Sequence, residues 1–337
     1  MNKIQSGSNE SSGSEEIVLS IITPAFNEED NLPVLFQRLS QVLDPLHLLW
    51  EWIIVDDHSD DNTFSCITKI SSLKKHIKGI RFSKNSGSHT ALACGLHQAS
   101  GNCAVVIAAD LQDPPELIPD FIQQWKKGAH IIWGTRRMRP GDPIQTIGFS
   151  RIYFYLMRRF VGLQDMPPTG SDFFLLDRQV VKAFCQFAET NVSTMGLLTW
   201  LGFEQSFLPY DKNERLHGTS GWNFEKKIKI IVDSITAFTY KPIRIMSYMG
   251  FCTALSGFCC ACIVFFKALF IGTPVLGYPS LMVAILVIGG MQMLMLGLLG
   301  EYLWRALDEA RRRPRYIMEA MIGDIQEPSF TCDKIKN

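Results

Sequence analysis

Two oxygen-bearing side chains at the end of an apolar run are the first residues here that could do chemistry. The apolar run covers residues 103–109, Asp110 and Gln112 follow it, and two prolines stand at 114 and 115. We predict a central strand over 103–109 and a helix from the prolines onward, which places both side chains at the carboxyl edge of a sheet, where open α/β sheets bind ligands. If the segment is extended, Asp110 and Gln112 share one face. Such oxygens suit Mg²⁺ or Mn²⁺ beside a diphosphate; the alternative is an ordinary strand-to-turn junction with a solvated aspartate.

The loop after the predicted strand at residues 17–23 also carries polar atoms. It contains Pro24, Phe26, Asn27 and Glu28, and a predicted helix begins just beyond it. The proline fixes a turn, and the side chains of Asn27 and Glu28 can hydrogen-bond to a base or a ribose. A capped helix start without a ligand uses the same residue types and stays an alternative.

Carboxylates crowd the loop after the predicted strand at residues 52–56. Asp56, Asp57, Asp60 and Asp61 fall around one turn. Capping the following helix needs one of these carboxylates. The excess of acidic groups indicates a binding role for Asp56 and Asp57.

A third loop, residues 84–89, combines a cation with a glycine before an alanine-rich helix. Lys84, Asn85 and Gly87 supply the charge, the polar side chain and the conformational freedom. A contact from Asn85 and Gly87 to a phosphate or a base fits this pattern. A glycine-containing turn with no ligand fits it nearly as well.

The elements that must position these loops alternate along the chain. β-Branched runs at residues 17–23, 52–56, 79–83, 103–109 and 129–134 are separated by helical periods near 29–43, 61–75, 88–99 and 115–127. Such alternation predicts an α/β domain with a mainly parallel sheet and helices on both faces. We place this domain at residues 17–220, after a disordered tail at 1–16 that is rich in Ser, Gly, Asn and Glu and is no signal peptide.

Two uncharged apolar runs follow the domain. They cover residues 246–266 and 278–300, and Gly272, Pro274 and Gly277 mark a turn between them. Each run is about one bilayer core long, so we predict a transmembrane hairpin with spans at 245–271 and 278–302. Buried helices of a soluble protein are the alternative. Basic residues flank the outer ends of both runs, which predicts a multi-pass protein of the cell membrane with its domain and both termini in the cytoplasm.

Residues 221–244 predict an amphipathic juxtamembrane helix. Apolar residues recur there at three- and four-residue steps from Phe224 to Phe238, and Lys226, Lys227 and Lys229 lie beside them. This is the pattern of a helix on an anionic membrane surface. Packing of the same stripe against the protein's own core is the alternative, and a second copy in a homo-oligomer could cover part of it. Residues 303–337 form a basic cytoplasmic C-terminal segment in this interpretation.

The overall composition limits the range of functions. The chain has 337 residues, with 33 Lys and Arg against 33 Asp and Glu, so its formal net charge is zero. This balance gives no reason to expect nucleic acid as a partner. The 9 cysteines are scattered, which suits free thiols in a reducing cytoplasm.

Taken together, these motifs resemble the inverting glycosyltransferases of family 2, whose catalytic domain has the fold called GT-A. Over residues 17–320 the resemblance narrows to the polyisoprenyl-phosphate glycosyltransferases, a group that includes dolichyl-phosphate mannose synthases and, closest to this chain, the bactoprenol glucosyltransferases. The segments that carry it are residues 24–28, 55–57, 85–87, 110–116, 170–173, 215–220 and 300–303.

The resemblance implies roles for individual residues. Asp110 and Gln112 are expected to bind Mg²⁺ or Mn²⁺ and, with Asp172 and Arg215, to form the catalytic group. The residues expected to bind a nucleotide sugar are Pro24, Phe26, Asn27, Glu28, Asp56, Asp57, Asn85, Gly87, Asp110 and Arg136. Arg215, Ser220 and Arg136 are expected to hold the phosphate of a polyprenyl phosphate. The implied reaction transfers a sugar, with inversion, from UDP-glucose to undecaprenyl phosphate at the cytoplasmic face of the membrane, for modification of surface glycans.

One departure from the family pattern affects the metal site. Family members usually have Asp-Ala-Asp where this chain has Ala108-Ala109-Asp110, so the first carboxylate is missing. Losing an anionic ligand weakens a site for a hard cation. A weakened or non-catalytic nucleotide-sugar binder therefore stays an alternative. Two further alternatives do not depend on this residue. One is another donor, such as GDP-mannose or a different UDP-sugar, and the other is a processive polysaccharide synthase, which normally has more membrane spans.

Overall fold

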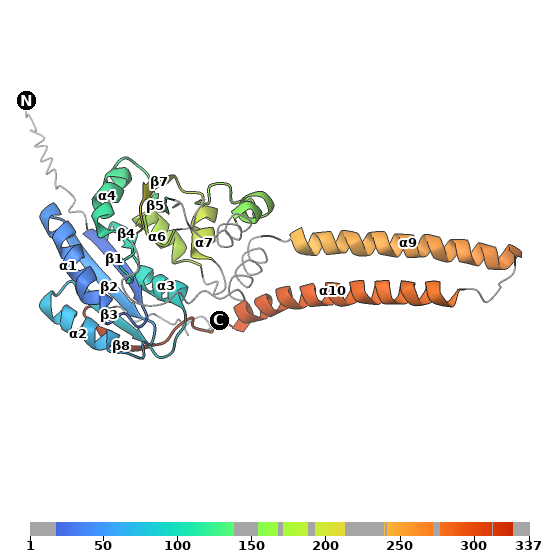
Figure 1. Ribbon diagram of the computed structural model, residues 1–337, viewed down its shortest axis with the longest axis horizontal. Helices are drawn as coiled ribbons and strands as arrows, with labels where there is room; N and C mark the ends of the chain where they lie inside the picture. Colours follow the sequence, from blue (N-terminus) through green and yellow to red (C-terminus); the bar gives the residue numbers. More distant parts are fainter. Residues whose placement is uncertain are drawn as a thin grey trace, which may run out of the picture.

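The computed structural model describes residues 18–137, 154–167, 171–187, 193–212, 239, 241–271, 277–311 and 313–325. An α/β domain occupies one end of the molecule, and two long helices run side by side away from it (Figure 1). The domain carries every described loop that the sequence marks as chemical.

A single mixed sheet of eight strands forms the centre of the domain, in the order β7-β5-β6-β4-β1-β2-β3-β8. The strands are β1 (Val18–Ala25), β2 (Leu49–Asp56), β3 (Ile77–Phe82), β4 (Cys103–Val106), β5 (Ile131–Arg136), β6 (Phe174–Asp177), β7 (Gln205–Tyr210) and β8 (Met318–Ile322). The first five strands occur where the apolar runs predicted them. The last three are short or lie beyond the alternating part of the sequence, and they were not predicted.

Helices cover both faces of this sheet, because successive strand residues point to opposite sides. Leu19 and Ile21 face one core with α1 (Asn31–Leu43), α2 (Thr63–Leu73) and α4 (Ile118–Lys126). Ile22 and Ile53 face the other core with α3 (Ser88–Gln98), α6 (Arg178–Phe184) and α7 (Thr194–Trp200). Short helical turns complete the domain at η1 (Asp44–Leu46), η2 (Pro115–Leu117) and η3 (Leu156–Val161). The predicted α/β class with two helical layers is confirmed.

The sheet is less parallel than the sequence pattern suggests. β1 is parallel to β2 and β4, β2 to β3, and β5 to β7, whereas β6 runs antiparallel to β4 and β5, and β8 runs antiparallel to β3. These directions bring the carboxyl ends of β1 to β5 and β7, together with the amino ends of β6 and β8, to the same edge. The described loops that were predicted to bind a ligand therefore start or end at one edge of the sheet.

The two C-terminal helices form a hairpin. They are α9 (Lys241–Ile271) and α10 (Tyr278–Arg311), and the Tyr302 hydroxyl donates a hydrogen bond to the Thr239 carbonyl oxygen at the end nearest the domain, 2.9 Å away. Both helices extend beyond the predicted spans. In the part of the chain that the structure describes, one stretch, Val287–Asp308, is long and apolar enough to cross a membrane, and none of it is buried. Residues 221–238, most of the predicted juxtamembrane helix, lie outside the described residues.

The segment after the hairpin returns to the domain. Residues 303–337 were predicted to form a basic C-terminal segment, and within it α10 continues to Arg311 and β8 then pairs with β3 at the edge of the sheet, a strand that was not predicted. The ring of Tyr316 stacks on Phe82 with centroids 4.9 Å apart. The chain that leaves the hairpin thus becomes part of the domain core.

Candidate functional site

The loops after β1 and β2 hold each other in place through side-chain to backbone bonds. The Asn27 N–H donates to Ser59 Oγ at 2.9 Å, and the Asn27 amide oxygen accepts from the Asp60 N–H at 2.9 Å. Asn27 itself has a positive φ of 57°, a conformation in which asparagine is tolerated better than most residues. Its neighbour Phe26 is 43% exposed, so an aromatic face and an amide are presented at the edge of the sheet.

Other atoms of the first loop bond to the helices α1 and α2. The Glu28 carboxylate accepts from the Asn31 side chain at 2.6 Å, and the Glu28 N–H donates to Thr63 Oγ1 at 2.8 Å. Pro24 lies within β1 and is half-buried. Asp30, the N-cap of α1, makes no side-chain capping bond, so Glu28 braces Asn31 and α2 without capping the helix.

The two adjacent aspartates after β2 do different things. Asp57 accepts from the Ser86 N–H at 2.6 Å and from the Gly87 N–H at 2.8 Å, so it ties the second loop to the third. Burial raises the pKa of the Asp57 carboxyl, against the two N–H groups that favour its charged form. Asp56 is fully buried and bonds to Arg81 and Ser59. Asp56 therefore shapes the loop from within instead of facing a ligand.

The third loop is open on its outer side. Gly87 has a φ of +89°, and a Cβ built there would meet nothing within 4 Å. Asn85 is exposed beside it. A bound molecule could reach the backbone at this point, as a glycine at a ligand-facing turn allows.

The turn that carries Asp110 differs from the sequence prediction. β4 ends at Val106, and Leu111 has a φ of 59°, so residues 110–112 form a turn and not an extended segment with both side chains on one face. The Asp110 carboxylate accepts from the Gln112 N–H at 3.2 Å, and the Leu111 side chain is buried. The turn brings the carboxylate of Asp110 and the backbone of Gln112 together, while Ala108 is half-exposed just before them.

A second group of charges surrounds this turn. Asp113 is buried and accepts from the Tyr210 hydroxyl, and its Oδ1 lies 3.6 Å from Lys212 Nζ. Burial raises the pKa of the Asp113 carboxyl; Lys212 and Tyr210 oppose the rise, and the negative charges of Asp172 and Asp110 add to it. Asp172, which is exposed at the start of β6, therefore lies close enough to act on this cluster.

Of the residues predicted to hold the acceptor phosphate, the structure describes Arg136. Arg136 is the last residue of β5 and is exposed at the same edge. Arg215 and Ser220 lie outside the described residues, so their predicted contacts with an acceptor phosphate stay predictions. Among the predicted residues, the structure brings together Asn27, Asp57 and Gly87 on one side and Asp110, Gln112 and Asp172 on the other.

Sequence reasoning gave no role to four residues that the structure places at this edge. Asp113 lies within residues 110–116, one of the segments that carry the family resemblance, so the sequence did contain a sign of its role. Tyr210 and Lys212 follow a strand, β7, that was not recognised. Arg81 lies on β3 and bonds to Asp56 on β2. The hydrophobic pattern of a single sequence does not predict such a pair of polar side chains across two strands.

The donor set at the turn fits a hard divalent cation. Asp110 and Gln112 offer a carboxylate oxygen and an amide oxygen, the ligand types that Mg²⁺ and Mn²⁺ prefer. The described residues contain no group of three or more His, Cys, Asp or Glu side chains able to hold a metal ion. An ion at Asp110 and Gln112 therefore needs further oxygens, and the phosphates of a substrate are the natural source.

Comparison with known proteins agrees with this geometry. Residues 20–184 match the model of Glycosyl transferase family 2, and residues 241–305 match the GtrB C-terminal hairpin. An uncharacterized glycosyltransferase of Synechocystis sp. is 38% identical over 307 residues, which are 91% of this chain and 96% of that protein. The bactoprenol glucosyl transferase of Shigella phage SfV is 33% identical over 303 residues, 89% of this chain and 98% of that one.

The similarity to solved structures is more distant. Glucosyl-3-phosphoglycerate synthase from Mycobacterium tuberculosis, crystallised with Mn²⁺, UDP-glucose and phosphoglyceric acid, is 16% identical, with a TM-score of 0.45 over 64% of this chain and 78% of that one. The assignment rests on the sequence relatives and on the two family models. This chain belongs to glycosyl transferase family 2 and carries the GtrB-type C-terminal hairpin.

Proposed function

We propose that this protein transfers a sugar from a nucleotide diphosphate sugar to a polyprenyl phosphate at the membrane, with inversion at the anomeric carbon. UDP-glucose is the proposed donor and undecaprenyl phosphate the proposed acceptor, because relatives over about nine-tenths of the chain are named bactoprenol glucosyl transferases. The observation that carries the proposal is the gathering of the polar loops and the domain end of the hairpin at one edge of the sheet.

The nucleotide is proposed to lie over the first three loops. Phe26 offers an exposed ring, Asn27 an amide, and the Asp57-bound backbone of Ser86 and Gly87 a close approach for a base or ribose. The diphosphate then extends toward Asp110 and Gln112. A divalent ion bound there would stabilise the negative charge that develops on the departing diphosphate.

The acceptor needs little activation. A lipid phosphate is already an anion near neutral pH, since the second pKa of such groups is about 6. Its oxygen attacks the anomeric carbon from the face opposite the leaving group. Asp172, exposed beside the Asp110 turn, is proposed to orient a sugar hydroxyl or the acceptor, and Arg136, with Arg215 and Ser220, to hold the acceptor phosphate.

The hairpin is proposed to anchor the domain so that its open edge faces the membrane. Lys241 and Arg244 lie at the domain end of α9, and Arg311, Arg313 and Arg315 lie at the domain end of α10 or just beyond it. Such a bias of positive charge supports a cytoplasmic domain with both helices crossing the membrane. The lipid tail of the acceptor can then stay in the bilayer while its phosphate reaches the site.

A transfer assay tests this function. The full chain in membrane vesicles is given undecaprenyl phosphate and, in separate reactions, labelled UDP-glucose, other UDP-sugars and GDP-mannose, with Mn²⁺ or with a chelator. We expect metal-dependent transfer from UDP-glucose, loss of metal-dependent donor binding in Asp110→Ala, and in Arg215→Ala a loss confined to the use of the acceptor. Equal loss of donor affinity in both variants contradicts the division into donor and acceptor residues.

A second candidate function follows from Ala108. A non-catalytic nucleotide-sugar or lipid-phosphate binder would tolerate the missing carboxylate, and this substitution is the observation that favours it. The same assay with excess Mn²⁺ separates the two: binding of the donor without turnover identifies the binder. Sustained turnover identifies the enzyme.

A further inference from the structure

The strand that follows the hairpin contributes one side chain to the loop region. β8 pairs with β3 so that Arg81 faces Ala320 and Phe82 faces Met318, and the register shifts between Arg81 and Phe82. Glu319 is therefore the extra residue of a β-bulge on β8. Bulges redirect a side chain away from the regular alternation, and Glu319 Oε2 here accepts a hydrogen bond from Arg81 Nε at 3.2 Å.

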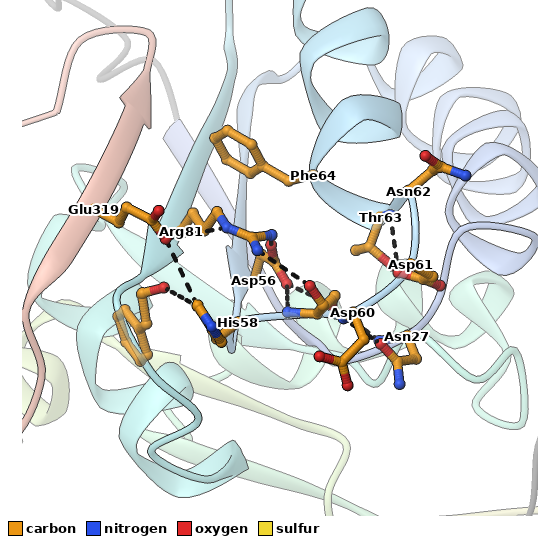
Figure 2. A network of polar contacts seen from close by, with 12 residues as sticks. Asn27, Asp56, His58, Asp60, Asp61, Asn62, Thr63, Phe64, Arg81 and Glu319 are labelled. Carbon is orange, nitrogen blue, oxygen red and sulfur yellow. Dashed lines mark hydrogen bonds and ion pairs between the residues drawn. The ribbon is translucent and has the colours of Figure 1, made fainter.

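Arg81 uses each of its guanidinium nitrogens on a different element. Nε donates to Glu319, Nη1 donates to Asp56 Oδ2 at 2.6 Å, and Nη2 donates to the Ser59 carbonyl oxygen at 3.1 Å (Figure 2). The Phe64 ring covers the guanidinium with its centroid 5.7 Å away. The rigid fork of an arginine suits this task, because its donors point in fixed directions within one plane.

The contacts continue from Asp56 to the exposed loop. Asp56 Oδ1 accepts from the Ser59 N–H at 2.9 Å and from its hydroxyl at 2.5 Å. Ser59 Oγ in turn accepts from the Asn27 N–H. A continuous path therefore runs from Glu319, through Arg81 and Asp56, to the loop proposed to meet the nucleotide.

The members of this path differ in burial, and this decides what each can do. Asp56 is fully buried, the Arg81 side chain is 21% exposed and the Glu319 side chain is 50% exposed. Removing the charge of Arg81 leaves the Asp56 carboxylate buried without its cation, which destabilises a fold strongly. Losing the charge of the half-exposed Glu319 lowers the free energy of unfolding only slightly. Glu319 is thus the member that can adjust the loop without unfolding it.

We propose that Glu319 and Arg81 are positioning residues for the nucleotide sugar. Glu319 orients the guanidinium of Arg81, and Arg81 holds Asp56 and the Ser59 carbonyl oxygen, so that Asn27 keeps the position from which it meets the donor. The inference rests on the proposed function. Because β8 is the continuation of α10, the segment that leaves the hairpin then sets the affinity of the site for its soluble substrate.

The test uses Glu319→Gln in the full chain, which keeps the size of the side chain and removes its charge. We expect the KM for UDP-glucose and the Kd for UDP-glucose measured by calorimetry to rise about three- to fivefold, the range of a half-exposed ion pair. The KM for undecaprenyl phosphate and kcat should stay within about twofold, because a contact made equally in ground and transition states changes KM alone.

Arg81→Lys extends the test. Lysine keeps the charge next to Asp56 but not the fork, so it should weaken donor binding at least as much as Glu319→Gln. The double variant should bind no worse than Arg81→Lys alone, since residues on one path give non-additive losses. If the losses of donor affinity in the two single variants add up in the double variant, the two residues do not act along one path.

Asp44→Asn is the matched control. It breaks an ion pair with Lys74 in which Asp44 is 49% exposed, at the opposite edge of the sheet from the loops. An unchanged donor affinity in Glu319→Gln, or an equal loss in Asp44→Asn, overturns the positioning role. If the unaltered protein binds UDP-glucose but transfers nothing, the proposed function fails and the calorimetric comparison still decides the positioning role. If it binds no UDP-glucose, both fail.

Discussion

The turn at residues 110–113 holds two buried carboxylates that have different partners. Asp110 accepts from the Gln112 N–H close to the partly buried Ala108, whereas Asp113 lies against Tyr210 and Lys212. Oδ1 of Asp113 is therefore engaged by the Tyr210 hydroxyl and the Lys212 ammonium. Asp110 is the carboxylate proposed to meet a metal ion and a diphosphate, and Ala108 is the position where the family resemblance predicts another carboxylate.

Ala108→Asp should raise transfer activity at least about tenfold, by adding an anionic oxygen that stabilises transition-state charge. Ala108 is only partly buried, just before the Asp110 turn. Turnover at saturating donor and the Mn²⁺ dissociation constant from electron paramagnetic resonance are the measurements. Ala108→Asn is the control, because it has the same shape without the charge. No gain over Ala108→Asn at saturating metal shows that this position does not belong to the metal site.

Asp57→Asn should loosen the third loop. The carboxylate accepts one backbone N–H on each oxygen, and an amide can accept only one of them. The remaining N–H of Ser86 or Gly87 loses its acceptor, which costs about 1–3 kcal/mol of unfolding free energy. We expect calorimetry to show weaker binding of UDP-glucose. The control is Asp60→Asn, which removes an exposed carboxylate of the same turn and should leave the affinity for UDP-glucose unchanged. Equal affinity in the two variants would exclude this role for Asp57.

The strands and helices were predictable to the extent that their sequences are periodic. β1 to β5 and the helices between them are continuous apolar or amphipathic runs, so their order and the gathering of their loops follow from the sequence. β6 and β7 stand in a stretch without that alternation, and β8 follows the hairpin, in the segment predicted to be basic. Their pairing depends on which strand edges are left open, a property of the assembled sheet.

The site was predictable to a similar extent. The loops and Asp110 were found because their residue types are unusual after apolar strands. The turn at Leu111 was missed, because a positive φ at leucine has no signal in the sequence. The bond between Arg81 and Glu319 was missed because 238 positions separate them and no local pattern links them.

At the opposite edge of the sheet, Glu51 joins several elements and provides a prediction about pH. Burial raises the pKa of the Glu51 carboxyl, but hydrogen bonds from Lys78, Ser20 and Ser100 outweigh this and lower it below its usual value of 4.5. A lowered carboxyl pKa means that the folded state binds fewer protons, so this stabilisation is complete above about pH 5 and is lost as the pH falls through the lowered pKa.

Glu51→Gln should therefore lower the free energy of unfolding by about 3 kcal/mol at pH 7, because it leaves the mostly buried ammonium group of Lys78 without its anion. The difference from the unaltered protein should shrink at pH 4. Urea titration in detergent, followed by tryptophan fluorescence, measures both. Glu116→Gln, which breaks an exposed pair with Arg38, should change stability by less than about 1 kcal/mol. A difference that persists unchanged at pH 4 contradicts the ionic origin of the effect.

For the whole molecule, the zero net charge conceals a division into a polar domain and an apolar hairpin. The exposed apolar side chains of α10 include Met293, Leu294, Leu296 and Leu299, whereas the large apolar side chains of the sheet are mostly buried. An exposed apolar surface of this kind on a long helix is stable where hydrocarbon surrounds it. Lys241, Arg244 and Arg311 lie at the domain end of the same hairpin, which supports the proposal that the edge of the sheet that holds the loops faces the membrane.

A lysine placed in the middle of this apolar surface should weaken insertion of the hairpin. Leu296→Lys puts a charge within Val287–Asp308, where 59% of the leucine side chain is exposed, at a cost of about 2.5–3.5 kcal/mol. Leu307→Lys is the control, because a lysine near the end of the span can extend its ammonium to the interface. We expect carbonate extraction to release Leu296→Lys but not Leu307→Lys, with donor affinity unchanged in both and transfer to undecaprenyl phosphate reduced only in the released protein. Equal membrane retention of the two variants would show that this surface of α10 faces protein, and the hairpin would then need a second copy of the chain to cover it.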